Sequence, residues 1–267
     1  MRRPPAVAGT FYPARPEPLN RQLQQLMAPT QTPRSVLAGV VPHAGIMYSG
    51  PVAGAVYERL EFPPSAILLG PNHYGRGSPM AIFSEGSWET PLGEVMVDAE
   101  LAAALCQACP SLTKDPEAHR LEHSLEVQLP FLQHRAPGLH VVPIILSVGR
   151  LAPIEALGRA LATVVAARQP RPLLLASTDF THYEPDSAAR LKDRKAIDRI
   201  LALDPRGLYD TVHREKISMC GYEPTVAVLT ALGELGAREA ELVRYATSGD
   251  ITGDRSSVVG YAGILLW

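Results

Sequence analysis

The alternation of two kinds of segment constrains the fold of this 267-residue chain more than any other feature of its sequence. Apolar runs of strand length recur, as expected for strands buried on both faces of a sheet; they lie at 36–41, 66–69, 141–148, 172–177, 242–246 and 258–266. Segments with helical periodicity fill gaps between them, at 17–27, 50–60, 98–108, 119–135, 151–168, 187–203 and 222–236. The sequence therefore predicts an α/β fold, a three-layer sandwich with a central, mostly parallel or mixed sheet.

The spacing of turn-forming residues predicts a single domain over residues 1–267. The 25 prolines and 21 glycines are scattered along the chain rather than gathered into a linker. A shorter strand pair around 80–97 is expected to decorate the main sheet. Hydrophobic residues make up 46% of the chain and charged residues 19%, which is enough apolar material for a sizeable core and excludes general disorder.

Charge and cysteine content bound the partners and the compartment. The 25 basic and 27 acidic residues give a net charge of −2, so no global field favours nucleic acid or an anionic membrane as a partner. No apolar run reaches the ~18–20 residues that span a bilayer, and prolines interrupt residues 1–13, so we expect a cytoplasmic protein. Three cysteines fit a reducing compartment, and Cys106 and Cys109 end a helical run where helix packing explains them.

Three of the apolar runs end in histidine motifs. The run 36–41 leads into His43, the run 66–69 into His73, and the run 172–177 into Asp179 and His182. Ligands of open α/β sheets bind outside the carboxyl ends of the strands, so these side chains should meet at one edge of the sheet. Because histidine is the commonest transition-metal ligand, the pattern predicts a metal site there.

Two further residues could take part in such a site. Cys220 stands just before the helix expected from residue 222, where a thiol pKa is depressed; the thiolate could bind a metal or attack an electrophile, and both roles stay open. The spacing of Asp179 and His182 would let the carboxylate cap the following turn or orient the imidazole, leaving His182 as a general acid or base.

The other histidines carry weaker signals. His123 and Glu126 are i, i+3 neighbours on one face of the helix expected over 119–135, where they could supply a ligand pair, a supporting carboxylate, the rim of a pocket or plain helix surface. The remaining histidines are expected on the solvated surface; they are His119, His134, His140 and His213. Neither a glycine-rich phosphate loop nor a G-x-S-x-G motif is present, so a nucleotide cofactor and an α/β-hydrolase nucleophile are not indicated.

Taken in order, the motifs resemble those of the Memo family, called AmmeMemoRadiSam system protein B in prokaryotes. The resemblance covers nearly the whole chain, and its motifs are Ala8-Gly9-Thr10-Phe11-Tyr12-Pro13, Pro42-His43-Ala44-Gly45 with Tyr48-Ser49-Gly50, Gly70-Pro71-Asn72-His73, Glu122-His123-Ser124-Leu125-Glu126, Ser177-Thr178-Asp179-Phe180-Thr181-His182-Tyr183, Met219-Cys220-Gly221, and Ser248-Gly249-Asp250 through Val259-Gly260-Tyr261-Ala262.

The resemblance implies a fold similar to the class III extradiol dioxygenases, in which two histidines and a carboxylate hold a non-haem Fe(II). His43 and His73 match the two histidine ligands, and Cys220 takes the place of the carboxylate. His182 matches the catalytic histidine, with Asp179 beside it. A thiolate in place of a carboxylate admits copper or zinc as well as iron. The prokaryotic name also implies a pathway link to AMMECR-like and radical-SAM proteins.

These inferences predict a metal-binding protein with Fe(II), or alternatively Cu or Zn, that performs an oxidation or oxygen-dependent reaction on an unknown small molecule. His182 would move the proton, and pocket-lining or supporting roles are expected for Tyr12, Tyr48, His123 and Glu126. Two alternatives are a non-catalytic adaptor that holds a ligand or peptide in a dioxygenase-like cleft, and a zinc-dependent hydrolase in which His182 is the base.

Overall fold

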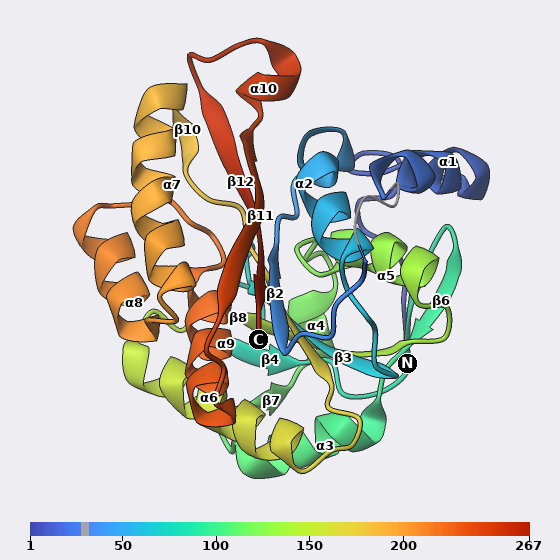
Figure 1. Ribbon diagram of the computed structural model, residues 1–267. Helices are drawn as coiled ribbons and strands as arrows, with labels where there is room; N and C mark the ends of the chain where they lie inside the picture. The colour runs from blue at the N-terminus through green and yellow to red at the C-terminus, as the bar shows by residue number, and fades with distance from the viewer. Residues whose placement is uncertain (28–31) are drawn as a thin grey trace.

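The computed structural model describes residues 1–27 and 32–267, and a large mixed sheet runs through it with helices on both faces (Figure 1). The predicted three-layer α/β architecture is thereby confirmed. The strands are β1 Arg2–Arg3, β2 Ala38–Val41, β3 Ser65–Pro71, β4 Met80–Ile82, β5 Ser87–Thr90, β6 Gly93–Met96, β7 Thr113–Lys114, β8 His140–Leu146, β9 Leu173–Ser177, β10 His182–Glu184, β11 Ala240–Thr247 and β12 Val258–Leu266. The helices are α1 Pro16–Leu26, α2 Ile46–Glu58, α3 Ala99–Ala108, α4 Pro116–His119, η1 Glu126–Gln128 (a 3₁₀ helix), α5 Leu129–Arg135, α6 Leu151–Ala166, α7 Asp186–Leu201, α8 Pro205–Arg214, α9 Tyr222–Leu235 and α10 Gly249–Thr252.

The centre of the sheet is parallel and its margins are antiparallel. Along the sheet the order is β10-β12-β2-β9-β3-β8-β4-β7, with β11 also paired to β12. The strands β2, β9, β3 and β8 are parallel neighbours, whereas β12 and β4 run antiparallel beside them. Since parallel strands end at the same edge, the segments that follow β2, β3 and β9 emerge together there.

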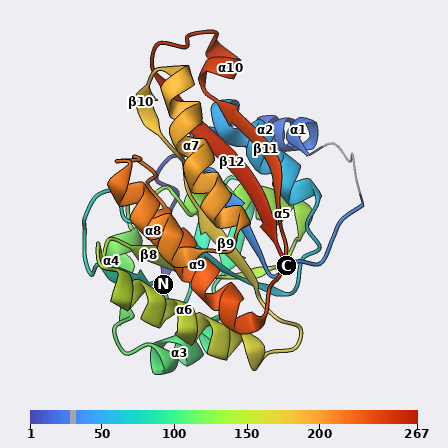
Figure 2. The ribbon, with the colours of Figure 1, turned by 60° about the vertical axis from the view of Figure 1, so that its left-hand side comes forward.

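Helices cover both faces of the sheet, which explains why its strands are apolar throughout. Along β3, Ile67 and Leu69 belong to the core cluster shared with α6 and α9, whereas Ala66 and Leu68 belong to the cluster shared with α2 and α5. Successive side chains of a strand point to opposite faces, so each central strand contributes to both clusters. Figure 1 shows α1, α2 and α5 on one side of the sheet and α6 to α9 on the other; Figure 2 brings the second layer forward.

The segment 80–97 is divided between two sheets. β4 pairs with β8 and extends the main sheet, while β5 and β6 form a hairpin that makes a small second sheet with β1. The prediction of a decorating pair is therefore correct for β5 and β6 and wrong for residues 80–82, because β4 finds a partner in the main sheet. Helix α8 and the short helices α4 and α10 were not predicted.

The predicted helix over 119–135 is correct for 129–135, where α5 forms, and wrong for residues 120–125. α4 ends at His119, and residues 120–125 cross beneath the strand ends before η1 and α5 begin. The loop is fixed there because Ser124 Oγ donates to the carbonyl of Pro71 and Ser177 Oγ donates to the carbonyl of Ser124. His123 and Glu126 therefore do not share a helix face. None of the helices in residues 1–27 and 32–267 is both long and apolar enough to cross a membrane.

Candidate metal centre

A cavity of about 680 Å³ opens at the carboxyl edge of the parallel strands. Residues that follow β2, β3 and β9 line it, and they include His43, His73 and Asp179. The loop after α4 adds His123, and β10 adds His182. The residues that follow separate strands in the sequence thus lie around one space, as the strand-end argument predicts.

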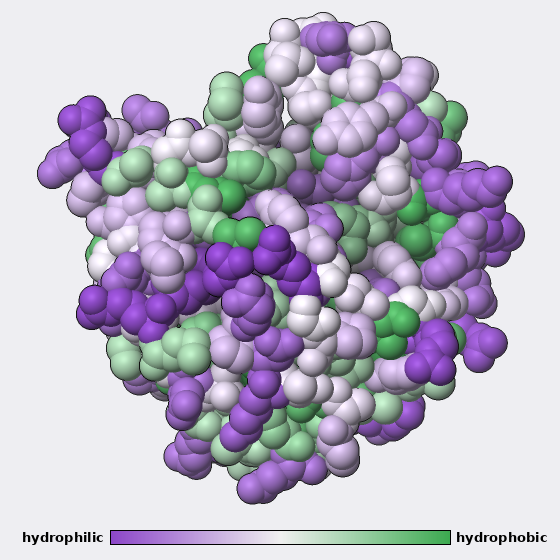
Figure 3. Space-filling model, turned by 180° about the vertical axis from the view of Figure 1, so that it is seen from behind, coloured by the Kyte–Doolittle hydropathy of each residue, from purple (hydrophilic) through white to green (hydrophobic). Residues whose placement is uncertain are grey.

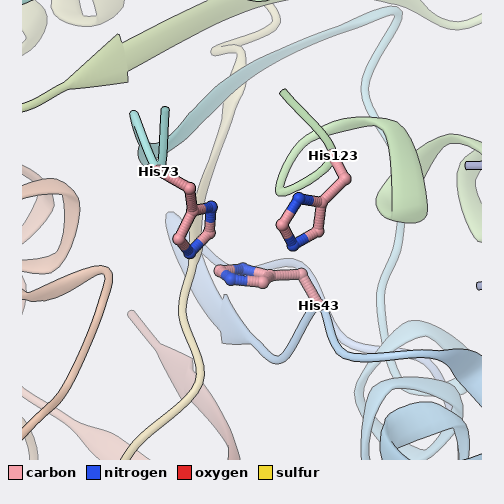
Figure 4. Close-up of side chains that lie close together, drawn as sticks. All are labelled: His43, His73 and His123. Atoms are coloured by element: carbon pink, nitrogen blue, oxygen red, sulfur yellow. The ribbon is translucent and has the colours of Figure 1, made fainter. Parts of the chain in front are cut away.

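Three imidazoles converge at one end of this cavity (Figure 4). One ligand nitrogen from each of His43, His73 and His123 lies within 4.8 Å of the others. The ring centroids are 5.2 Å apart for His43 and His73, 4.6 Å for His73 and His123, and 5.7 Å for His43 and His123. Three imidazoles at this spacing could hold one metal ion. The sequence had suggested a supporting or rim position for His123, and the structure brings it to the centre of the group.

Hydrogen bonds fix which nitrogen of His43 carries the proton. Nδ1 lies 2.9 Å from Ser177 Oγ, whose hydroxyl proton is already donated to the carbonyl of Ser124. Ser177 Oγ also accepts from Gln128 Nε2, so it can serve His43 only as an acceptor. Nδ1 of His43 is therefore the protonated nitrogen, and Nε2 keeps its lone pair. His43 is buried, and this burial, reinforced by the neighbouring histidines, lowers its pKa well below the usual value, so the ring is neutral.

Glu122 fixes the protonated ring nitrogen of His73, as Ser177 does for His43. Its carboxylate accepts from the His73 backbone amide at 2.7 Å, from the ring Nδ1 at 2.9 Å and from the Ser124 amide at 2.8 Å. Burial alone would raise the pKa of Glu122, but the hydrogen bond and charge of His73 overcome it and lower that pKa to about 2. Nδ1 of His73 donates to the carboxylate, which leaves Nε2 free. A carboxylate behind a ligand histidine is the usual way in which a metal site fixes the tautomer and the ring orientation.

The donor set fits a metal ion. In addition to Nε2 of His43 and of His73, Nδ1 of His123 is a candidate ligand atom, because it is buried and has no hydrogen-bond partner within the described chain. A buried polar atom without a partner is destabilising unless something else binds it. The His123 ring is held between His73 and Phe11, whose centroid lies 4.7 Å away. His43, His73 and His123 together are therefore a possible ligand set.

Cys220 lies beside this group. Its Sγ is 3.3 Å from Nε2 of His43 and accepts a hydrogen bond from the Asp179 amide at 3.2 Å. The expected depression of its pKa is wrong: burial, and then the nearby Asp179 carboxylate, raise the pKa of the thiol. Proximity to the start of α9 does not outweigh these two effects.

Asp179 and His182 both line the cavity but are held by different partners. Asp179 is buried, and its Oδ1 accepts from the His43 amide at 2.8 Å. The Nδ1 of His182 donates instead to the carbonyl of Ser218 at 2.8 Å, and Ser218 Oγ accepts from the His182 amide. Ser218, rather than Asp179, thus orients the His182 ring, because the Asp179 carboxylate is directed to the turn after β2.

The other predicted pocket residues divide into two groups. Tyr48 lines the cavity. Tyr12 and Glu126 lie behind its wall, where the Tyr12 hydroxyl donates to Glu126 Oε1 at 2.6 Å and Arg3 Nη1 pairs with Oε2 at 2.8 Å. Glu126 also accepts from the backbone amides of residues 6 and 7. This buried network fastens the segment that carries Phe11.

Sequence reasoning missed three residues that support the histidines, namely Glu122, Ser177 and Gln128. A carboxylate directly before His123, and polar residues at the end or flank of apolar runs, were the available signals. His119 was expected in solvent but is fully buried, with its ring against those of Phe83 and Trp88. His140 and His213 are exposed as expected, and His134 is half-buried.

Comparisons with known proteins agree with the motif order. Residues 3–265 match the family described as Memo-like protein. A MEMO1 family protein of Methanopyrus kandleri is 45% identical, covering 99% of both chains, and one of Methanosarcina barkeri is 44% identical, also covering 99% of both. Among solved structures, the uncharacterized protein JW3007 from Escherichia coli K12 has a TM-score of 0.55 at 18% identity, over 85% of this chain and 98% of that one, which shows a shared fold. The chain belongs to the family of Memo-like proteins.

Proposed function

We propose that this protein binds one metal ion through His43 and His73, with His123 or Cys220 as the third ligand, and acts as an oxidoreductase on a small organic molecule. The observation that carries the proposal is the pair of imidazoles whose Nδ1 atoms are held by Ser177 and Glu122, so that Nε2 of each ring is the nitrogen left for a ligand, beside the thiol of Cys220 at the end of a cavity. A site with three protein ligands keeps positions open for a small molecule.

The dioxygenase resemblance of the motifs supports Fe(II) first, with copper or zinc next. Imidazole suits all three metals, and a thiolate at Cys220 would shift the preference toward copper or zinc. When bound, such an ion would supply Lewis-acid or redox chemistry. The dioxygenase resemblance of the motifs favours an oxygen-dependent reaction for an iron-loaded protein.

His182 is the residue proposed to move a proton. Its Nδ1 is committed to the carbonyl of Ser218, so Nε2 is the nitrogen that can exchange a proton with a molecule in the cavity. An imidazole held in this way contributes about 10²–10⁴-fold when it meets the reacting proton at hydrogen-bond distance. Buried Asp179 supports the neighbouring turn and thereby positions His43.

A zinc-dependent hydrolase is the second candidate, because a three-histidine set such as His43, His73 and His123 is one that catalytic zinc uses. Zinc lowers the pKa of bound water to about 7, and His182 would then be the base. Oxygen uptake with a phenol and catechol panel supports the first candidate, whereas ester hydrolysis that persists without oxygen supports the second.

The first experiment is metal analysis of protein purified anaerobically, alongside His43→Ala, His123→Ala and Cys220→Ser. We expect near-stoichiometric metal in the wild type and a large loss in His43→Ala; the other two variants identify the third ligand. His140→Ala, an exposed histidine outside the cavity, is the control and should keep its metal. A metal-free wild type that also fails to bind added Fe(II), Cu(I) or Zn(II) would reject the proposal and favour a non-catalytic binding protein.

A further inference from the structure

The part of the cavity nearer to the solvent differs in chemistry from the end formed by His43, His73 and His123. Four aromatic side chains line it, namely Phe11, Tyr48, Tyr183 and Tyr261, and the hydroxyls of Thr10, Ser248 and Ser257 are interspersed with them. Aromatic walls with a few neutral hydrogen-bonding groups fit a flat organic molecule of modest size. A volume of about 680 Å³ is sufficient for one aromatic ring with a short side chain.

Lysine and arginine side chains do not contribute to the described walls of the cavity. None of the described residues that line the cavity is a lysine or an arginine. The arginines nearest in sequence to its outer wall are engaged elsewhere: Arg190 pairs with Asp186 and Asp250 at 2.8 Å, and Arg255 reaches the same two carboxylates at 3.5 and 3.4 Å. Lys192 is likewise held by Glu184. Proteins that recognise carboxylates or phosphates normally present arginine or lysine to them, and this cavity presents none.

A carboxylate stands in the outer wall instead. Asp254 lines the cavity and is exposed. Its Oδ1 accepts from the amide and hydroxyl of Ser256, at 2.9 and 2.7 Å, while Oδ2 accepts from no described residue. Oδ2 is therefore open to a donor from a ligand. An ammonium group placed here would also meet aromatic faces, with which cations interact favourably.

We infer that the cavity selects a small aromatic molecule that carries no anionic group, with a neutral or ammonium side chain directed to Asp254. This inference rests on the proposed function, because it takes the cavity as the place where the small molecule binds. It excludes phosphate esters and carboxylic acids as preferred ligands. An anion in the outer part of the cavity would face Asp254, and no lysine or arginine among the described lining residues would compensate its charge.

The test uses three phenols that differ only in the end of a two-carbon side chain: 4-ethylphenol, tyramine and 3-(4-hydroxyphenyl)propanoate. Each is titrated by calorimetry and NMR into the full chain, once after metal removal and once after Zn(II) loading. We expect the carboxylate to bind at least tenfold more weakly than 4-ethylphenol in both forms, and tyramine to bind at least as tightly as 4-ethylphenol. A carboxylate that binds as tightly as 4-ethylphenol in both forms, or the absence of binding by all three, would overturn the inference.

Reversing the charge of Asp254 tests the selecting residue. Asp254→Lys should strengthen binding of the carboxylate at least tenfold and weaken binding of tyramine. Asp210→Lys is the matched control, since Asp210 is an exposed residue of α8 outside the cavity wall and the variant has the same net charge. Asp254→Asn keeps an Oδ1 acceptor for Ser256 and should abolish only the advantage of tyramine. An unchanged ranking in Asp254→Lys would remove Asp254 from ligand selection.

The two proposals can fail separately. Protein that binds no metal but ranks the phenols as expected would reject the metal site and leave the ligand class standing. Protein that binds metal through His43 and His73 but prefers the carboxylate would do the opposite.

Discussion

The two sides of the cavity are held in place in different ways. On the histidine side, charges are buried and paired. Arg3 donates hydrogen bonds to the backbone carbonyls of His119 and Glu122 and pairs with the Glu126 carboxylate. Its guanidinium also stacks 4.0 Å over the Trp88 ring. Figure 1 shows the opposite side rising to α10, at the projecting end of β11 and β12. There the ion pairs of Arg190 and Arg255 are partly or largely exposed, and Tyr183 is 79% exposed with a φ of 58°.

The more rigid side of the cavity is the one that would hold a metal ion. A metal ligand that moves by a fraction of an ångström loses its geometry, so its supports are buried, hydrogen-bonded and rigid. The side that would admit a ligand is built from a surface loop whose contacts are individually weak in water. On the face of the molecule shown in Figure 3, hydrophobic residues form small groups separated by polar ones.

The largest expected effect comes from breaking the buried pair on the histidine side. Arg3→Met should lower the free energy of unfolding by about 3–5 kcal/mol, because it leaves the buried Glu126 carboxylate without its cation. Arg2→Met is the adjacent control; the Arg2 side chain is 62% exposed, and its pairs with Glu89 and Glu94 should contribute at most about 1 kcal/mol. Urea titration of both variants measures the difference. Equal losses would show that burial does not distinguish the two pairs.

The next effect concerns the support of His73. Glu122→Gln should weaken metal affinity about 10–100-fold, because the amide is a poorer acceptor for Nδ1–H and no longer fixes the tautomer as firmly. Competition with a chromophoric chelator, using Zn(II), gives the affinity. Glu117→Gln, at an exposed position of α4, should leave the affinity unchanged. Unaltered affinity in Glu122→Gln would mean that His73 does not bind the ion through Nε2.

A smaller effect is expected on the outer side. Arg190→Met removes pairs with Asp186 and Asp250 that are partly exposed, so the loss of unfolding free energy should stay near 1 kcal/mol, far below that of Arg3→Met. Its influence should appear in ligand binding, because the loop 248–257 lines the cavity. A loss as large as that of Arg3→Met would contradict the comparison.

The smallest expected effect is the pH dependence of the stability that the pairs of Arg190 with Asp186 and Asp250 contribute. The hydrogen bond from Arg190 lowers the pKa of Asp186. Burial alone would raise the pKa of Asp250, but hydrogen bonds from the Thr247 amide and from Arg190 lower it. A carboxylate whose folded pKa is depressed stabilises the fold above its unfolded pKa, near 4, and loses that contribution as the pH falls further. Wild type should therefore lose stability between about pH 5 and 3 more steeply than Arg190→Met. Parallel unfolding curves at pH 6, 5, 4 and 3 would test it; identical slopes would contradict it.

The layers of the fold, and the edge of the sheet at which its polar residues meet, could be predicted from the amino-acid pattern alone. Apolar runs that lead into His43, His73 and Asp179 require strands buried on both faces, and parallel strands bring their ends together whatever lies between them. Local periodicity and strand ends carry this information without knowledge of distant contacts.

Which residues form the candidate metal site, and which residues hold them in place, depends on contacts between segments that are far apart in the chain. Residues 120–125 have an apolar stripe typical of a helix. Contacts with the carbonyl of Pro71 and with Arg3 hold them as a loop instead. This loop places His123 among the clustered imidazoles and Glu122 behind His73. His119 is buried with its ring against those of Phe83 and Trp88, and burial of the Cys220 thiol, followed by the Asp179 carboxylate, reverses the expected shift of its pKa. Each outcome depends on a partner that is far away in the chain, and a local pattern carries no information about such a partner.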